Sequence, residues 1–311
     1  MRVAVFGTGG VGGYFGGKLA QAGEDVIFIA RGEHLGEIQK NGLRVESILG
    51  DFTVYPARAT SDPVKVGPVD AVLLGVKAWQ VSEAAAAMRP LLRSDTIVIP
   101  LQNGVEAPTQ LSAVLGPQGI LGGLCKISTL VAAPGVIRHL ALEPYIAFGE
   151  LDGRPNTLAY RLCEAFLRSG VRAEIPADIQ AAMWEKFLFI AAFSGLSAVT
   201  RSAVGALRSQ PELWSMLERA MEEIYSVARA RRINLPQDVV ARTLAFVQGL
   251  PAGATPSMTR DILEGKRSEL DYQNGAVVRM GLEAGIPVPV NTFVYYSLLP
   301  QELKARGKLS G

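Results

Sequence analysis

A lysine within an apolar helical stretch is well suited to acid–base chemistry. Lys186 lies between Trp184 and Ile190 in the run Met-Trp-Glu-Lys-Phe-Leu-Phe-Ile. A positioned ammonium can donate a hydrogen bond, and then a proton, to an oxygen on which negative charge develops, as when hydride adds to a ketone. The alternative is a lysine whose stem lies over apolar surface while its charge stays in water. Spacing alone does not exclude this second role.

A glycine-rich turn stands near the start of the chain. Between a strand predicted at 3–6 and a helix predicted at 14–22 lie Gly7, Thr8, Gly9, Gly10, Val11 and Gly12. In the pattern Gly-x-Gly-x-x-Gly, the first glycine makes a tight turn, the second lets the backbone approach a pyrophosphate, and the third lets helix and strand pack closely. The phosphates then lie at the positive end of the helix. The strand–turn–helix context therefore predicts dinucleotide binding.

An arginine at the end of the second predicted strand indicates which dinucleotide binds. An acidic residue there bonds the ribose 2′-hydroxyl of NADH, whereas an arginine accommodates the 2′-phosphate of NADPH. The strand 26–29 runs into Ala30 and Arg31, with Glu33 close behind. Arg31 therefore favours NADPH, the alternative being an ordinary solvated arginine.

Two polar residues follow later strands. Lys77 comes after a strand predicted at 71–76, and Asn103 follows one predicted at 96–100, with an alanine-rich helix at 79–92 between them. Ligands of parallel sheets bind beyond the carboxyl ends of the strands, so both residues are candidates for a site. Each also has an ordinary role, because a lysine after a strand commonly points to water and Asn-Gly commonly forms a turn.

The stretch 255–275 is dense in polar residues between two helical patterns. Ser257 is predicted to cap a helix beginning near Met258, with Asp261 completing a capping box. Glu269 is predicted in the first turn of the next helix, where an acid suits the helix dipole. These structural roles suffice, so spacing alone assigns no function here.

Other chemistries have little support in the sequence. The two histidines, His34 and His139, stand at no metal-binding spacing, so no metal site is expected. Cys125 and Cys163 form no Cys-x-x-Cys motif, and both are predicted to be buried thiols. No Gly-x-Ser-x-Gly motif indicates a serine nucleophile.

Composition is that of a globular protein. The 311 residues exceed one compact core and predict two domains. A net charge of +2 gives no reason to expect nucleic acid or a membrane surface as a partner. The apolar run 187–193 is shorter than the roughly 20 residues of a membrane span, and no signal peptide pattern is seen, so we expect a cytoplasmic protein.

The predicted elements indicate two architectures in succession. An N-terminal Rossmann domain at 1–177 contains a doubly wound parallel sheet, and an all-α domain follows at 178–311, beginning with a long helix at about 178–192. The remaining predicted elements of the first domain are a hairpin of strands 43–47 and 52–55, strands 120–130, 136–140 and 145–149, and a helix 158–168.

Several separated motifs together resemble the ketopantoate reductase family. They are the glycine-rich turn, Val76-Lys77-Ala78-Trp79-Gln80, Gln102-Asn103-Gly104, Trp184-Glu185-Lys186, the stretch 257–275 and the segment 283–292. The resemblance implies a Rossmann domain followed by a helical domain, NADPH as hydride donor, and reduction of 2-dehydropantoate to pantoate on the route to pantothenate.

The resemblance also implies roles for individual residues. Lys186 becomes the general acid, Asn103 a residue near nicotinamide and substrate, and Ser257 a contact of the substrate carboxylate. Glu269 becomes a residue on the cofactor side that helps to organise the lysine. The cofactor contacts expected beyond the glycine-rich turn are Arg31, Lys77, Asn103, Ser128 and Glu269.

One departure from the family concerns the substrate. Members usually carry asparagines four and eight residues after the lysine, and here these positions are Ile190 and Ser194. Isoleucine offers neither donor nor acceptor, and a lost hydrogen bond to a polar substrate costs about 1 to 3 kcal/mol. We therefore keep open a related 2-oxo acid with an apolar group where pantoate has a hydroxyl.

Two other functions are considered. A β-hydroxy acid dehydrogenase shares the two-domain plan and a lysine on the helix between domains, but resembles 257–275 less. A non-catalytic NADPH sensor would need none of Lys186, Asn103 and Glu269. The expected partner is a small 2-oxo acid, and the chain is expected to be a monomer or a homodimer.

Overall fold

The chain divides into two compact units. The computed structural model describes residues 1–309. One unit comprises Met1–Gln102 and Ala107–Ile179, and we call it the Rossmann unit. The other comprises Asn103–Glu106 and Gln180–Gly311, and we call it the helical unit. The predicted fold class, a Rossmann sheet followed by an all-α part, is confirmed.

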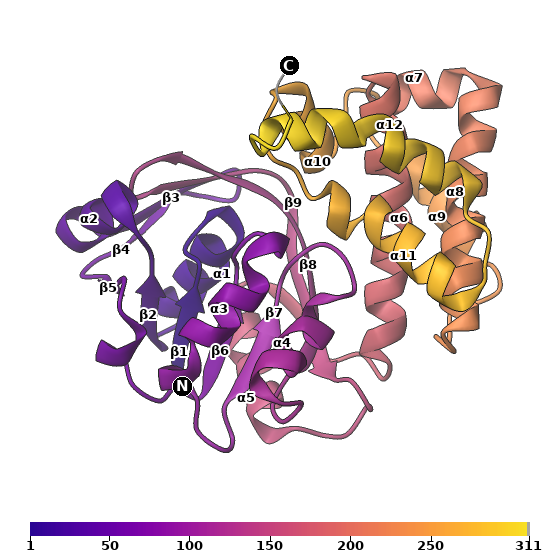
Figure 1. The fold of residues 1–311 in the computed structure, drawn as a ribbon. Coiled ribbons are helices and arrows are strands. Elements are labelled where there is room, and N and C mark those ends of the chain that lie inside the picture. Colours follow the sequence, from indigo (N-terminus) through magenta and orange to yellow (C-terminus); the bar gives the residue numbers. More distant parts are fainter. Residues whose placement is uncertain (310–311) are drawn as a thin grey trace. The chain divides into compact units, whose positions relative to one another are not determined.

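A parallel sheet forms the centre of the Rossmann unit. Its strands are β1 (Arg2–Phe6), β2 (Asp25–Ile29), β5 (Arg58–Thr60), β6 (Ala71–Leu74) and β7 (Ile97–Pro100). They lie in the order β5-β2-β1-β6-β7, and all neighbours are parallel (Figure 1). In β1, Val3 and Val5 belong to one apolar cluster while Ala4 and Phe6 belong to another. Both faces of the sheet are therefore buried, as expected of continuous apolar strands.

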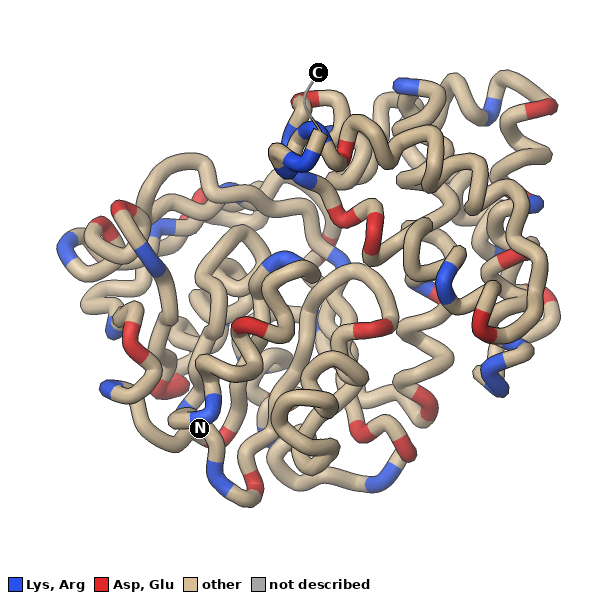
Figure 2. Tube along the Cα trace, in the orientation of Figure 1, with Lys and Arg blue, Asp and Glu red and all other residues tan. Residues whose placement is uncertain are grey.

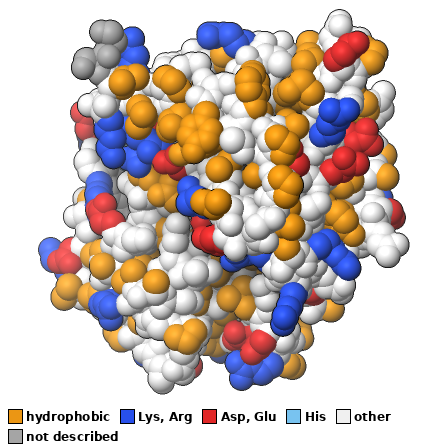
Figure 3. All heavy atoms as spheres, turned by 45° about the vertical axis from the view of Figure 1, so that its right-hand side comes forward, with side chains coloured by type: hydrophobic (Ala, Val, Ile, Leu, Met, Phe, Trp, Pro, Cys, Tyr) orange, Lys and Arg blue, Asp and Glu red, His pale blue; other side chains and the backbone are white. Residues whose placement is uncertain are grey.

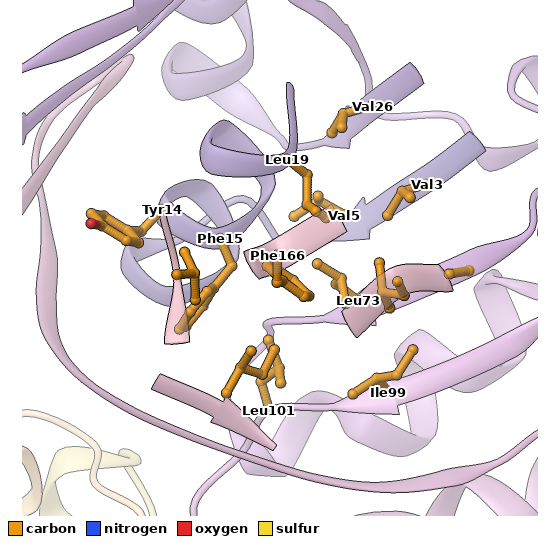
Figure 4. Packing of buried hydrophobic residues seen from close by; sticks show 14 of the residues in the cluster. Val3, Val5, Tyr14, Phe15, Leu19, Val26, Leu73, Ile99, Leu101 and Phe166 are labelled. Carbon is orange, nitrogen blue, oxygen red and sulfur yellow. The ribbon is translucent and has the colours of Figure 1, made fainter. Parts of the chain in front are cut away.

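Helices cover both faces of this sheet. They are α1 (Gly10–Gln21), α2 (Gly32–Asn41), α3 (Val81–Ala87), α4 (Ala107–Leu115) and α5 (Thr157–Arg168). Phe15 of α1 and Phe166 of α5 pack edge to face in one cluster (Figure 4), whereas α3 and α4 contribute to the other. Three 3-10 turns are η1 (Pro63–Lys65), η2 (Ala78–Gln80) and η3 (Arg89–Leu91).

The helix predicted at 79–92 is wrong in its extent. The structure has a 3-10 turn, the short helix α3 and a second 3-10 turn over these residues. Pro90 lies in the second 3-10 turn, and proline both lacks an N–H and clashes with the carbonyl four residues earlier. The α-helix therefore ends at Ala87.

A second sheet extends the Rossmann unit. Its strands are β3 (Leu43–Ser47), β4 (Phe52–Val54), β8 (Leu121–Ala133), β9 (Val136–Glu150) and β10 (Arg172–Glu174). The predicted hairpin is confirmed as β3 and β4, although it joins this sheet and not the parallel one. The strands predicted at 136–140 and 145–149 are one strand, β9, because pairing with β8 continues through an irregularity near Ser128. The short strand β10 was not predicted.

The helical unit contains only helices and turns in the part that the structure describes. They are α6 (Ile179–Thr200), α7 (Val204–Ser209), α8 (Pro211–Ala230), α9 (Val239–Gln248), α10 (Ser257–Leu263), η4 (Leu270–Tyr272), α11 (Asn274–Ala284) and α12 (Pro289–Ala305). Proline stands in the first turn of α8 and α12, where its fixed φ favours helix initiation.

Helix α6 is the core of the helical unit. Its residues Phe187, Leu188 and Leu196 are buried in one cluster with Leu217 and Ile224 of α8. The helix is longer than predicted, since it continues to Thr200. Length and composition alone would allow α6 to cross a membrane, but 67% of its apolar window is buried inside the protein, as in a core helix.

The surface mixes charges of both signs. Figure 2 shows acidic and basic residues interspersed along both units. Figure 3 shows hydrophobic side chains in small groups separated by charged and other polar groups. The exposed apolar residues of the helical unit include Phe246, Leu282, Phe293 and Tyr296.

Candidate active site

The expected cofactor residues of the Rossmann unit lie on segments that follow the strands at one edge of the parallel sheet. Phe6, at the end of β1, is in register with Ile29 of β2 and Leu74 of β6. The segments that follow these strands therefore begin side by side. They carry the glycine-rich turn, Arg31 and Lys77, so the structure brings these three parts of the expected site to the same edge.

The glycine-rich turn depends on close backbone approach. Gly7 has φ +96°, and a Cβ on it would lie 2.8 Å from the backbone nitrogen of Val76. A Cβ on Gly12 would lie 2.2 Å from the carbonyl oxygen of Gly7. A Cβ on Gly9, by contrast, would come no closer than 4.0 Å to the Gly75 carbonyl oxygen. The fold thus requires glycine at 7 and 12, whereas Gly9 faces open space.

Strand β8 passes beside the turn. A Cβ on Gly10 would lie 2.9 Å from Thr129 Oγ1 and 3.0 Å from the Leu130 backbone nitrogen. Ser128, the preceding residue of β8, is half-buried, as is Val11 at the start of α1. The structure therefore brings the β8 segment that carries Ser128 next to the turn.

Thr8 and His34 hold the turn in place. Thr8 donates to the carbonyl of Ile29 from both its backbone nitrogen (3.2 Å) and its hydroxyl (3.0 Å). The Gly135 N–H donates to His34 Nδ1 at 2.9 Å, so the ring proton is on Nε2, which donates to the Thr8 carbonyl at 2.7 Å. His34 is a residue that sequence reasoning missed, since nothing in its surroundings distinguishes it from a surface histidine on a helix.

Arg31 and Lys77 are both exposed cations. Arg31 precedes α2, and its guanidinium lies 3.5 Å from Glu83, with both side chains about two-thirds exposed (67% and 69%). Lys77 Nζ lies 5.8 Å from the centre of the Trp79 ring. Nearby, the buried Gln102 amide donates to the carbonyls of Leu74 (2.8 Å) and Val76 (2.9 Å), which stabilises the end of β6.

These groups fit a dinucleotide. The turn stands at the N-terminal, positive end of α1, where backbone N–H groups favour phosphate. The open space at Gly9 is where a phosphate-bearing ligand could approach the backbone. Arg31 and Lys77 add positive charge at the same edge of the sheet.

In the helical unit, three expected residues share one side of α6. Lys186, Ile190 and Ser194 are spaced by four residues, which places them on the same helix face. Lys186 and Ile190 are half-buried, whereas Ser194 is buried. Within residues 1–309 the Ser194 hydroxyl has no hydrogen-bond partner, while its carbonyl accepts from Thr259 Oγ1 at 3.1 Å. The face therefore presents a cation, an apolar group and a hydroxyl in turn.

The predicted capping role of Ser257 is wrong. Ser257 is the first residue of α10, and the N-cap is Pro256, whose φ of −68° and ψ of 158° are extended. Because Ser257 is not the N-cap, the capping-box-like arrangement predicted for it with Asp261 is also wrong. Ser257 is half-buried at the start of a helix that contacts α6 through Thr259.

The prediction for Glu269 is also wrong in its structural part. Glu269 does not begin an α-helix but precedes the 3-10 turn η4. The residue is buried, at 7% exposure, and its carboxylate accepts a hydrogen bond of 3.3 Å from Asn103 Nδ2. The structure thus brings together two expected site residues that are 166 positions apart in the chain.

Further contacts join the two segments that carry this pair. Gly104 has φ +109°, and a Cβ there would lie 2.9 Å from the backbone carbonyl oxygen of Tyr272. Arg279 Nη2 donates to Glu106 (2.8 Å) and to the Asp271 carbonyl (2.9 Å). Arg279 was not predicted, because no local motif shows which segments a helical arginine will join.

The remaining candidates for reactive groups are metal-binding clusters and the two cysteines. Among residues 1–309 no group of three or more His, Cys, Asp or Glu residues could hold a metal ion. Cys125 is buried, as predicted, but Cys163 is only half-buried. Burial, and then the nearby Glu164 and Glu174, raise the pKa of the Cys163 thiol, which favours its protonated form.

Known proteins resemble this chain along nearly its whole length. The family model described as ketopantoate reductase PanE/ApbA matches residues 3–153, and the corresponding C-terminal model matches residues 178–302. The crystal structure of a PanE/ApbA family ketopantoate reductase from Ralstonia eutropha JMP134 is 35% identical, with a TM-score of 0.89, covering 98% of this chain and 100% of that one.

Two further relatives extend the comparison. The 2-dehydropantoate 2-reductase of Mesorhizobium japonicum is 30% identical over 93% of this chain and 94% of its own length. D-mandelate dehydrogenase, solved with NADH and anilino(oxo)acetate, is 23% identical with a TM-score of 0.88 over 98% of this chain and 100% of that one, which is a likeness of fold. Since both halves match the family models, the chain belongs to the ketopantoate reductase family of oxidoreductases.

Proposed function

We propose that this protein reduces the ketone of a small 2-oxo acid with NADPH as hydride donor and Lys186 as general acid. The observation that carries the proposal is the hydrogen bond between Asn103 and the buried Glu269, in the same unit that presents Lys186 on α6. A protein that only sensed NADPH would have no use for a lysine, an amide and a buried carboxylate together.

Each of these residues has a part in the reduction. NADPH supplies hydride to the carbonyl carbon when it is bound. The Lys186 ammonium donates a hydrogen bond to the carbonyl oxygen and transfers its proton as charge develops there. Glu269 accepts from the Asn103 amide and so orients it. The Ser257 hydroxyl binds the substrate carboxylate.

NADPH is favoured over NADH by the cations of the Rossmann unit. The Arg31–Glu83 pair at 3.5 Å is exposed on both sides. Such exposed pairs contribute only about 0 to 1 kcal/mol, so exchanging Glu83 for a ribose 2′-phosphate costs little. Lys77 provides a second exposed cation for the phosphates.

Two substrate classes are proposed, and Ile190 decides between them. The first is 2-dehydropantoate, the compound that appears in the name of the Mesorhizobium japonicum relative. The second is a 2-oxo acid with an apolar group in place of the pantoate hydroxyl, because Ile190 can only make apolar contact. A missing hydrogen bond of about 1 to 3 kcal/mol corresponds to about a 5- to 150-fold difference in kcat/KM.

The first experiment follows NADPH consumption with a panel of 2-oxo acids that includes 2-dehydropantoate. Lys186→Ala removes the general acid and should lower kcat by about 100- to 10,000-fold while NADPH binding persists. NADPH binding without turnover of any 2-oxo acid would support a sensor instead. Oxidation of 3-hydroxy acids, with no 2-oxo acid reduced, would support a β-hydroxy acid dehydrogenase.

The substrate classes are separated by changing Ile190. If an apolar side chain is preferred, Ile190→Asn should raise kcat/KM for 2-dehydropantoate relative to the apolar 2-oxo acids by about 5- to 150-fold. Ile190→Leu is the matched control, since it keeps an apolar group and should keep the native preference. A native enzyme that already turns over 2-dehydropantoate far better than every other acid would exclude the second class.

A further inference from the structure

The segment that carries Glu269 has little regular structure of its own. Helix α10 ends at Leu263 and α11 begins at Asn274, and only the short turn η4 lies between them. Such a segment lacks the repeated backbone bonds that hold a helical residue in place. The Glu269 carbonyl accepts from the backbone nitrogens of Tyr272 and Gln273, both at 3.0 Å, but these bonds stay within the segment. The place of the segment in the helical unit therefore depends on contacts from other elements.

Glu302 of α12 supplies the first of these contacts. Its side chain is buried and accepts from the Ser268 backbone nitrogen at 2.9 Å and from the Ser268 hydroxyl at 2.5 Å. The Ser268 hydroxyl in turn accepts from the Leu270 backbone nitrogen at 3.3 Å. Glu302 thus holds the residue before Glu269 directly, and the residue after it through Ser268.

Arg306, one turn later on α12, extends the contacts to Asp271. Its Nε donates to Glu302 at 2.6 Å and its Nη1 donates to Asp271 at 2.6 Å. Tyr295 donates from its hydroxyl to the other Asp271 oxygen at 2.9 Å. Burial acts to lower the pKa of Arg306, but its bonds to Asp271 and Glu302 outweigh burial and raise that pKa, so the guanidinium stays charged.

We propose that Glu302, Arg306 and Asp271 form a positioning network that holds Glu269 in its catalytic place. The proposal rests on the proposed function, because it assigns the network to the same reduction. An ion pair with a buried charge is often no more stabilising than apolar residues of similar size, so stability alone does not account for the buried Glu302 and its pair with Arg306. Their bonds fall on both sides of Glu269 in the chain, which is where a positioning device must act.

The network is tested by asking whether it acts through Glu269. Glu302→Gln keeps the shape of the side chain but removes its charge, and it should lower kcat about 10- to 100-fold with a smaller change in KM, as expected when a reacting group shifts slightly. In a Glu269→Gln background the same change should cost little more, because the two effects share one cause. Effects that simply multiply would overturn the proposal.

A milder variant and a control show whether a loss of activity comes only from a loss of stability. Ser268→Ala removes only the hydroxyl bonds and should lower kcat several-fold in the native background. Glu223→Gln is the matched control, because Glu223 likewise accepts from backbone nitrogens, of Val290 (2.7 Å) and Asn291 (2.9 Å), but none of its bonds reaches 268–271. It should lower stability and leave kcat within about two-fold, and an equal kcat loss in Glu223→Gln would overturn the proposal.

Amide hydrogen exchange separates this inference from the proposed function. If the native protein reduces no 2-oxo acid, the proposed function fails, and exchange at 268–271 then tests the network by itself. Faster exchange there in Glu302→Gln than in Glu223→Gln is expected. Equal exchange in the two variants would overturn the network.

Discussion

The glycine-rich turn 7–12 and the segment 268–271 both hold candidate site residues, but by different means. In the turn, backbone atoms of neighbouring segments touch, and a Cβ on Gly12 would lie 2.2 Å from the Gly7 oxygen. In the segment, the contacts come from side chains of α12, such as Glu302, which bonds to Ser268.

The two regions differ in how well a sequence predicts them. Steric requirements of a turn leave glycines at fixed spacing, because only glycine lacks the clashing atom. A side-chain network leaves ordinary residue types at irregular spacing, because many combinations of charged and polar groups could serve. Substitutions of single residues in each region should therefore have different effects.

The largest effect is expected from alanine at Gly12, compared with alanine at Gly9. Gly12→Ala forces a backbone shift and should lower the free energy of unfolding by about 1 to 3 kcal/mol and weaken dinucleotide binding. Gly9→Ala meets only an atom at 4.0 Å, so its stability should remain within about 0.5 kcal/mol.

For Gly9→Ala, however, NADPH should bind about 10- to 100-fold more weakly, because the added methyl group occupies the approach of the pyrophosphate. Urea unfolding and titration with NADPH measure the two quantities separately. Equal destabilisation by the two alanines would contradict the assignment of Gly9 to the ligand and Gly12 to the fold.

An intermediate effect is expected from removing the Arg31 guanidinium. Arg31→Ser should weaken NADPH binding about 10-fold, because a charge-assisted bond to the 2′-phosphate is lost, and should leave NADH binding unchanged. Arg154→Ser is the control, since Arg154 is an exposed arginine of the same unit paired with Asp152. If Arg31→Ser weakens the binding of NADPH and NADH equally, Arg31 does not bind the 2′-phosphate.

The smallest effect is expected on the pH dependence of stability when Tyr295, which contacts the segment 268–271, is changed. Burial, and then the hydrogen bond to Asp271, raise the pKa of Tyr295 from 10.0 to about 12. Between these values the unfolded chain loses the proton that the folded protein keeps, so this contribution to stability is present below pH 10 and is lost as pH rises toward 12.

Tyr295→Phe should therefore show a shallower fall of the free energy of unfolding across that pH range than the native protein. Denaturant unfolding at a series of alkaline pH values measures the slopes. Identical slopes would show that Tyr295 is not held by Asp271 and would remove one contact from the network.

Much of the fold could be predicted from the pattern of residues. The alternation of apolar strands and helices indicated the Rossmann unit, and the loss of strand signals after about residue 178 indicated the helical one. Errors arose where tertiary contacts compete with local preference. Strand β9 continues because β8 stays paired with it, and Pro256 takes the capping position predicted for Ser257.

The candidate site could be predicted only in part. The glycine-rich turn and Arg31 followed from local rules, whereas Lys186, Glu269 and Ser257 were assigned through resemblance to a family. His34 was missed because its two partners, Thr8 and Gly135, lie 26 and 101 positions away. No local pattern reports contacts over such separations.

The sequence by itself indicated the strand, turn and helix of the candidate dinucleotide site, because only glycine fits where a Cβ would meet neighbouring backbone, and this leaves glycines at fixed spacing. Only the tertiary structure decided that Asn103 meets Glu269 and that Glu302 and Arg306 hold the segment around it. These contacts depend on how helices pack, and packing is set by the apolar surfaces of the whole unit and not by the charged residues that it brings together.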